Sequence, residues 1–201
     1  RQYTSLCGIT EKEIHDNLEE ETRALATAQG LSYEETCDKL KEMYDGYHFA
    51  PDSEGVYNPF SLLNAFSKKT LSCYWFETGT PTYLVELLKH SDYNLANLTH
   101  VETSLSVLNN VYGDDKAIPV IYQSGYLTIK DYDREFGIYT LDFPNKEVEE
   151  GFMEFLLPCY SYTDATLSQS YVRQFVREIR EGNTDAFFRR LQSFFADTPY
   201  E

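Results

Sequence analysis

Apolar residues recur at helical spacing along the first 45 residues. Thr10 and Glu13 form a capping box, in which the two side chains satisfy free backbone N–H groups at the start of a helix. Gly30 ends this helix, because glycine readily adopts the left-handed conformation that closes a last turn. The apolar face consists of Ile14, Leu18 and Leu25. The pattern therefore predicts one helix between Thr10 and Gly30.

A second helix follows after a two-residue link. Ser32 and Glu35 repeat the capping box. The apolar positions recur at i, i+4, i+7 and i+11 and are Tyr33, Cys37, Leu40 and Tyr44. Because Gly30-Leu31 is so short, we expect the two helices to pack as an antiparallel pair.

Two further helices are predicted to begin at a cap followed by proline. Asn58 is a good N-cap and Pro59 a good first helical residue, and the helix continues past Phe66. Thr80 and Pro81 repeat this arrangement, with apolar positions that run on to about Lys89.

The second half of the chain holds the predicted β structure. Alternating residues at 126–132 and 138–143, with a turn at 133–137, predict a β-hairpin at about 126–143. A short strand is expected near Leu105–Val107 and a short helix from Ala117 to Gly125. Pro144-Asn145 ends the hairpin and caps a helix, and two more helices are expected near 172–179 and 187–195. The predicted fold class is mainly α, with a minor β part.

The net charge of the chain bears on which kinds of partner it can bind. The chain carries 33 acidic and 17 basic residues, a net charge of −16, which repels phosphate backbones and disfavours nucleic acid as a partner. A local exception is the helical face formed by Arg173, Arg177 and Arg180, at i, i+4 and i+7. Most such faces are simply solvated. In so acidic a chain, this one is the best candidate for docking an acidic partner or nucleic acid.

The cysteines and the apolar runs bear on the compartment. Four cysteines lie far apart, with neither zinc-site nor disulfide-framework spacing, and are expected to be reduced thiols. No run of about 18 apolar residues predicts a membrane span, and the start of the chain does not resemble a signal peptide. The chain begins at Arg1 without an initiator methionine, as a fragment would. We expect a cytoplasmic protein that does not contact a membrane.

Motifs for self-contained chemistry are missing from the sequence. ATP hydrolysis needs a glycine-rich loop with Lys for the phosphates and Ser or Thr for magnesium, and no such P-loop occurs. Asp52 and Asp114-Asp115-Lys116 imitate a nuclease signature, but both lie in turn-rich loops far apart, so we reject the match. We therefore predict no catalytic residue, cofactor site or metal site in this chain.

Two aromatic segments are the remaining candidates for a binding or coupling role. Tyr44-Asp45-Gly46-Tyr47-His48-Phe49 follows a helix directly, and Gly46 can end that helix with a positive φ. A structural corner is the favoured interpretation, and a ligand contact is the alternative. In the second segment, Thr78-Gly79-Thr80 precedes a helix and could bind an anion, although a sharp turn with a cap is simpler. Trp75 is expected to lie in the core.

A series of motifs resembles a bacterial family of proteins. The motifs are Cys7-Gly8-Ile9-Thr10, Tyr44-Asp45-Gly46-Tyr47-His48-Phe49, Val56-Tyr57-Asn58-Pro59-Phe60-Ser61, Tyr74-Trp75-Phe76-Glu77-Thr78-Gly79-Thr80-Pro81, Tyr122-Gln123-Ser124-Gly125-Tyr126-Leu127 and Phe143-Pro144-Asn145. Members of that family join an N-terminal AAA-type ATPase-like domain to a C-terminal nuclease domain of the PD-(D/E)XK superfamily. The resemblance runs in order along nearly the whole chain.

The resemblance implies that this chain lies between two catalytic domains. The family's P-loop and Walker B strand would precede residue 7, and its nuclease residues would follow residue 196. The implied organisation is a lid-like helical region at 1–57, a winged-helix-like connector at 58–145, and helices at 146–201 that lead toward the nuclease. ATP and Mg are then expected only in the missing N-terminal domain. No catalytic residue of the family has a counterpart here.

Three functions remain open from the sequence. The first is a non-catalytic lid and connector that couples nucleotide state to the nuclease or to a partner, through contacts with the flanking domains. The second is a winged-helix-type interaction module that binds a protein or, less readily, DNA, because the hairpin carries more acids than bases. The third is an unrecognised small enzyme.

Overall fold

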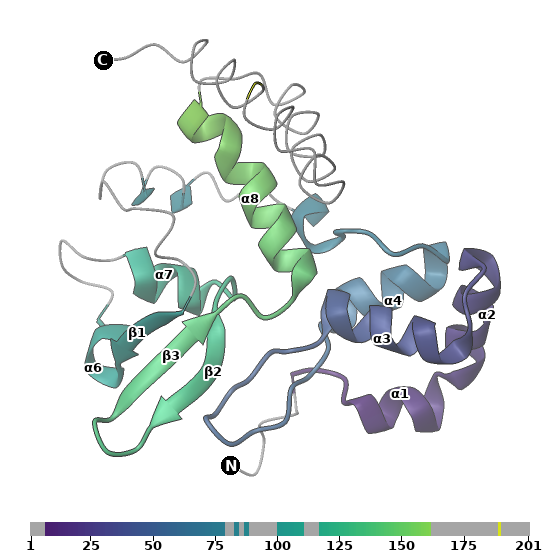
Figure 1. Ribbon diagram of the computed structural model, residues 1–201, viewed down its shortest axis with the longest axis horizontal. Coiled ribbons are helices and arrows are strands. Elements are labelled where there is room, and N and C mark those ends of the chain that lie inside the picture. Colours follow the sequence, from purple (N-terminus) through teal and green to yellow (C-terminus); the bar gives the residue numbers. More distant parts are fainter. Residues whose placement is uncertain are drawn as a thin grey trace. The chain divides into compact units, whose positions relative to one another are not determined.

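The computed structural model describes residues 7–78, 83, 84, 87, 88, 100–110, 117–161 and 189 (Figure 1). The chain divides into two compact units, Arg1–Gly151 and Phe152–Glu201. The helices predicted near 172–179 and 187–195 lie outside the described residues, except for Arg189, which is helical. Of the helix predicted after Pro81, residues 83, 84, 87 and 88 are described and are helical.

The first unit begins with four helices whose ends are set by local capping. They are α1 (Glu11–Asn17), α2 (Glu19–Gln29), α3 (Tyr33–Tyr44) and α4 (Pro59–Lys68). Both predicted capping boxes are present, and the Asn58 side chain accepts hydrogen bonds from the backbone N–H groups of Phe60 and Ser61. Gly30 closes α2 with a φ of 66°. These helix ends are confirmed.

One helix prediction was wrong. The helix expected between Thr10 and Gly30 is two helices, because the backbone at Leu18 leaves the helical region with φ −126° and ψ 24°. Leu18 packs against a core cluster that also contains Ile14 from α1 and Leu25 from α2. Tertiary packing therefore overrides the local helical pattern at this residue.

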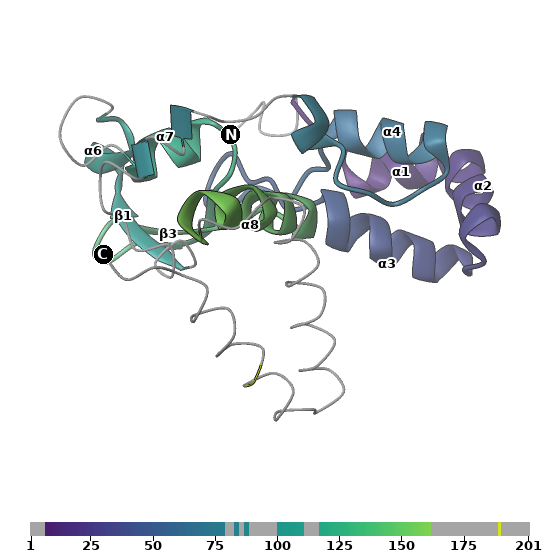
Figure 2. The same cartoon turned by 90° about the horizontal axis from the view of Figure 1, so that it is seen from above.

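The four helices share one apolar core. Figures 1 and 2 show α1 to α4 grouped together, and α2 packs against α3 across the Gly30-Leu31 link. The largest fully buried side chains of this core include Tyr44, Leu25, Leu40 and Leu62. The Tyr44 hydroxyl donates to the Ser72 carbonyl (2.9 Å) and accepts from the Ser72 N–H (3.0 Å). The first aromatic segment therefore starts inside the helical core.

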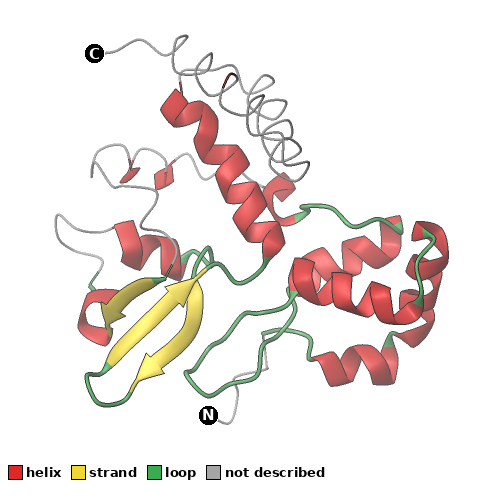
Figure 3. Ribbon diagram, viewed as in Figure 1, coloured by secondary structure: helices red, strands yellow, loops and turns green. Residues whose placement is uncertain are grey.

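The same unit contains a three-stranded antiparallel sheet (Figure 3). The predicted hairpin is confirmed as β2 (Thr128–Asp133) and β3 (Ile138–Asp142). The third strand, β1 (Val101–Ser104), pairs with β3 to give the order β1-β3-β2.

The strand predicted at Leu105–Val107 was wrong, because this segment is the short helix α6 (Leu105–Leu108). Leu108 is buried, whereas Leu105 and Val107 are exposed. One of these three apolar side chains is therefore buried, as on one face of a helix. The segment that pairs with β3 is the more polar one just before it, Val101–Ser104.

The remaining described elements complete the expected fold class. Trp75–Thr78 forms the 3₁₀ helix η1, Ala117–Gln123 forms α7, and Lys146–Ser161 forms α8. Asn145 caps α8 as predicted, with its side-chain oxygen 3.1 Å from the Val148 N–H. The fold is therefore mainly α with a minor β part. From Val101 to Asp142 the described elements follow in the order β1, α6, α7, β2, β3.

Candidate functional site

Residues 44–58 leave the helical core and contact the sheet; we call them the junction segment. Isolated β-bridges join Tyr47 to Val56 and Ile9 to Tyr57, so the segment doubles back on itself. The His48 N–H donates to the Thr128 hydroxyl (2.8 Å), which donates in turn to the His48 carbonyl (3.1 Å). Backbone and side-chain bonds therefore tie the junction segment to the first residue of β2.

A second tie is a close backbone approach at Gly46. Its φ of +101° favours glycine, and a Cβ built at this position would overlap the Pro144 carbonyl oxygen. The Lys130 ammonium donates to that same oxygen (2.9 Å) and lies 3.5 Å from the Gly46 carbonyl oxygen. Burial lowers the pKa of Lys130, while the charges of Asp142 and Asp45 oppose this shift.

Asp45 stands at the end of α3, beside this contact. Its Oδ1 atom is buried and has no hydrogen-bond partner among the described residues. Gly55 leaves room for this carboxylate, since a Cβ on Gly55 would lie 3.1 Å from Oδ1. The charge of Asp45 acts through space on two ammonium groups, those of Lys130 and Lys41, and favours the charged form of each.

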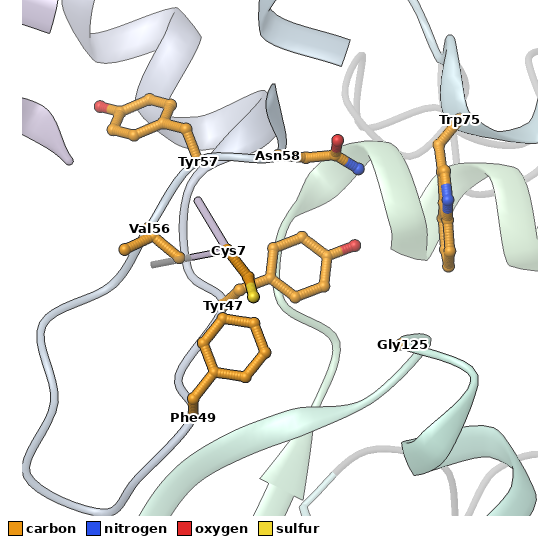
Figure 4. Close-up of a pocket in the computed structure, with 8 residues that line it drawn as sticks. All are labelled: Cys7, Tyr47, Phe49, Val56, Tyr57, Asn58, Trp75 and Gly125. Atoms are coloured by element: carbon orange, nitrogen blue, oxygen red, sulfur yellow. The ribbon is translucent and has the colours of Figure 1, made fainter. Parts of the chain in front are cut away.

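The two aromatic segments meet at a small cavity, here called the aromatic pocket (Figure 4). The cavity measures about 190 Å³. Figure 4 shows the rings of Tyr47 and Phe49 on one side and the Trp75 indole across from them, while the Tyr57 ring turns away. The lining residues are Cys7, Tyr47, Phe49, Val56, Tyr57, Asn58, Trp75 and Gly125.

The wall behind Trp75 is aromatic and tightly packed. The Trp75 ring centroid lies 4.9 Å from that of Tyr126 and 5.4 Å from that of Phe76. Phe76 in turn packs on the backbone of α8 at Gly151, where a Cβ would overlap its ring. The indole is therefore held in place from one side and borders the pocket on the other.

A buried carboxyl group lies behind the pocket. Glu147, in the first turn of α8, is 0% exposed, and its Oε1 accepts a hydrogen bond from the Trp75 backbone N–H (2.9 Å). The Ser61 hydroxyl and the Tyr74 amide also hydrogen-bond to the carboxyl group and favour its ionised form. Burial raises the pKa of Glu147, and the Trp75 amide opposes the shift. Burial also raises the pKa of the Tyr47 phenol, with a further contribution from the charge of Glu147.

The predicted site residues separate into two described groups, with Thr78 apart from both and the rest outside the described residues. Tyr47, Phe49 and Trp75 meet in the pocket, whereas Tyr44, Asp45 and Gly46 build the adjoining junction. Thr78 ends η1, and its side chain is not described. The other predicted residues lie outside the described residues, and they are Gly79, Thr80, Arg173, Arg177 and Arg180.

Sequence reasoning missed part of this site. Cys7, Val56, Asn58 and Gly125 line the pocket, and Glu147 lies behind it. All but Glu147 lie in the motif series quoted from the sequence, where Asn58, for example, was interpreted as a helix cap. A charged residue in a first helical turn looks exposed by default, so no local signal marked Glu147.

The described residues also bear on the requirements of a metal site, a disulfide and a membrane span. They contain no group of three His, Cys, Asp or Glu side chains placed to hold a metal ion. Cys7 and Cys37 are free thiols. Within the described part of the chain, none of the helices combines the length and apolar character that a membrane span requires.

Comparison with known proteins finds a relative that is longer than this chain. A protein of Azotobacter chroococcum mcd 1, described as an uncharacterized protein in the vnfD 5′ region, is 31% identical over 204 residues. The match covers 100% of this chain and 37% of that protein, so the chain spans little more than a third of its relative. No family model matches the chain, and no solved structure matches it.

Proposed function

We propose that this chain is a non-catalytic lid and connector segment. It would belong to a longer cytoplasmic protein that joins an AAA-type ATPase-like domain to a PD-(D/E)XK nuclease domain. In that protein the segment would couple the nucleotide state of the first domain to the nuclease or to a partner. ATP and Mg would bind to the ATPase-like domain, outside this chain.

The observation that carries this proposal is the junction segment. It begins in the helical core at Tyr44 and ends at the cap of α4, Asn58. Between these points it bonds to β2 through His48 and approaches Pro144 through Gly46. Because packed elements move as units, a displacement of the helices must be accommodated at the sheet. The ordered motif series and the greater length of the relative also support this placement.

The proposal is tested by assaying the 201-residue chain for catalysis. We expect no phosphate release from Mg-ATP, and no cleavage of double-stranded DNA, above the buffer blank. Turnover of either substrate that copurifies with the chain would sink the proposal.

A winged-helix-type interaction module is the second candidate, favoured by the strand and helix order around β1-β3-β2. Its partner would be a protein rather than DNA. α7, the helix before the hairpin, carries no basic residue. The two bases of the hairpin are already engaged, Lys130 with Pro144 and Arg134 with both oxygens of Asp52 (3.0 Å each).

DNA binding is checked by gel shift at physiological ionic strength. We expect no shift, because contacts to phosphates need free Lys or Arg side chains. A salt-dependent shift that weakens in an Arg134→Ala variant would reverse the preference for a protein partner.

A further inference from the structure

The aromatic pocket has a composition that suits a cation. Three ring systems border it, and none of its eight lining residues is basic. The faces of Trp, Tyr and Phe rings attract cations through their quadrupole, and Trp does so most strongly. Phe49 is 53% exposed, so one of the three rings can be reached from solvent. Gly125 leaves the neighbouring part of the Trp75 ring uncovered, because a Cβ on Gly125 would lie 3.7 Å from that ring.

The carboxyl group of Glu147, next to the pocket, can supply a negative charge opposite to that of a bound cation. Glu147 is fully buried. Its Oε1 accepts a hydrogen bond from the Trp75 backbone N–H, so the carboxyl group lies next to the backbone of a residue that lines the pocket. Ionising a fully buried carboxyl group is costly, and a cation in the adjoining cavity would offset part of that cost. The net charge of −16 also favours a basic partner over an acidic one.

The size of the cavity selects a side chain rather than a cofactor. At about 190 Å³ it lies below the roughly 300–1,000 Å³ of pockets that hold drug-sized ligands. A flat guanidinium group with its last methylenes fits such a space. Guanidinium stacks on aromatic faces and is more weakly hydrated than an ammonium, so arginine loses less on entering than lysine does. The Tyr47 hydroxyl points between Asn58 and Trp75 in Figure 4 and is hydrogen-bonded to the Asn58 side chain, and its remaining lone pair can accept from a guanidinium N–H.

We propose that the aromatic pocket binds an arginine side chain presented by a partner protein. The rings of Tyr47, Phe49 and Trp75 would contact the guanidinium plane, and the carboxylate of Glu147 would supply the opposite charge behind them. This proposal stands independently of the connector role, since it rests on the pocket and not on a flanking domain.

The test uses the fluorescence of Trp75, the single tryptophan of the chain. The 201-residue chain is titrated at physiological ionic strength with a short neutral peptide that contains one arginine. Two matched peptides carry lysine or citrulline, the uncharged isostere, at that position. We expect saturable quenching, with the arginine peptide binding at least about five-fold more tightly than the citrulline peptide. Equal affinity for citrulline, or for lysine, would overturn the assignment.

Two phenylalanine positions provide matched variants. Phe49→Ala removes an exposed ring of the pocket, and Phe136→Ala removes a ring that is 72% exposed on the hairpin turn. We expect the first to weaken arginine binding about three-fold or more and the second to leave it unchanged. Phe49→Leu keeps apolar volume while removing the ring, and should weaken binding as Phe49→Ala does. Wild-type affinity in both Phe49 variants, or an equal loss in Phe136→Ala, would place binding elsewhere and refute the proposal.

Discussion

A single methyl group at Gly46 tests whether the junction segment truly approaches the backbone before α8. The substitution Gly46→Ala adds a Cβ that would overlap the Pro144 carbonyl oxygen and lie 3.1 Å from the Pro144 carbonyl carbon. It would also lie 3.2 Å from the Lys130 ammonium nitrogen. The first two atoms are backbone, so the conflict is relieved only if the junction segment and the end of the hairpin move apart.

The expected cost has two parts. A residue with a Cβ held at positive φ loses about 1–2 kcal/mol. Overpacking a well-packed site adds about 1–3 kcal/mol. Gly46→Ala should therefore lower the free energy of unfolding by about 2–5 kcal/mol, a large share of the roughly 5–15 kcal/mol that keeps a domain folded. Gly30→Ala is the matched control, because Gly30 has a φ of +66° but nothing within 4 Å of its built Cβ, so it should lose only the conformational part.

The assay is urea denaturation of both variants and the wild type, followed by Trp75 fluorescence and far-ultraviolet circular dichroism. The midpoint should fall much further for Gly46→Ala than for Gly30→Ala, with similar slopes in a two-state analysis. Equal losses in the two variants would show that positive φ alone accounts for the effect, and would refute the close approach to Pro144.

Three other substitutions test separate parts of the structure. Tyr44→Phe should cost about 0.5–1.5 kcal/mol in denaturant unfolding, because it removes the hydroxyl that bonds both backbone groups of Ser72, and a loss near zero would contradict those bonds. The raised pKa of Glu147 means that its contribution to stability is present below its ordinary value of 4.5 and is lost as pH rises through the higher folded-state pKa. Glu147→Gln should therefore gain stability relative to wild type as pH rises across that window in a pH series of unfolding curves, and a constant difference would contradict the burial of this acid. Ser32→Ala should cost about 1 kcal/mol in thermal or urea unfolding by removing the α3 cap, and an unchanged midpoint would count against the capping box.

Local chemistry explains which parts of the fold could be predicted from the sequence. Helix ends depend on residues three or four positions apart, so the caps at Thr10, Ser32, Asn58 and Asn145 were all predicted correctly. The hairpin is likewise a local pattern. By contrast, β1 forms because Val101–Ser104 pairs with a strand about 40 residues later, and nothing in its own composition marks that pairing.

The site was predicted only in pieces for the same reason. Aromatic composition marked Tyr44–Phe49 and Trp75 as separate segments, but not their meeting around one cavity. Trp75 was expected in the core, whereas it packs on Tyr126 with one side and lines the pocket with the other. The buried acid Glu147 comes from a helix 72 residues further along the chain, and only the folded chain brings it to the Trp75 amide.

Native-state hydrogen exchange in rising urea tests the central claim, that the junction segment couples the helical core to the sheet, most directly. If the claim holds, amides of α3 (Tyr33–Tyr44) and β2 (Thr128–Asp133) exchange through one shared opening, with the same free energy and the same dependence on urea. In Gly46→Ala the two sets of amides should separate. Independent opening of β2 in the wild type, at a lower free energy than α3, would contradict the claim.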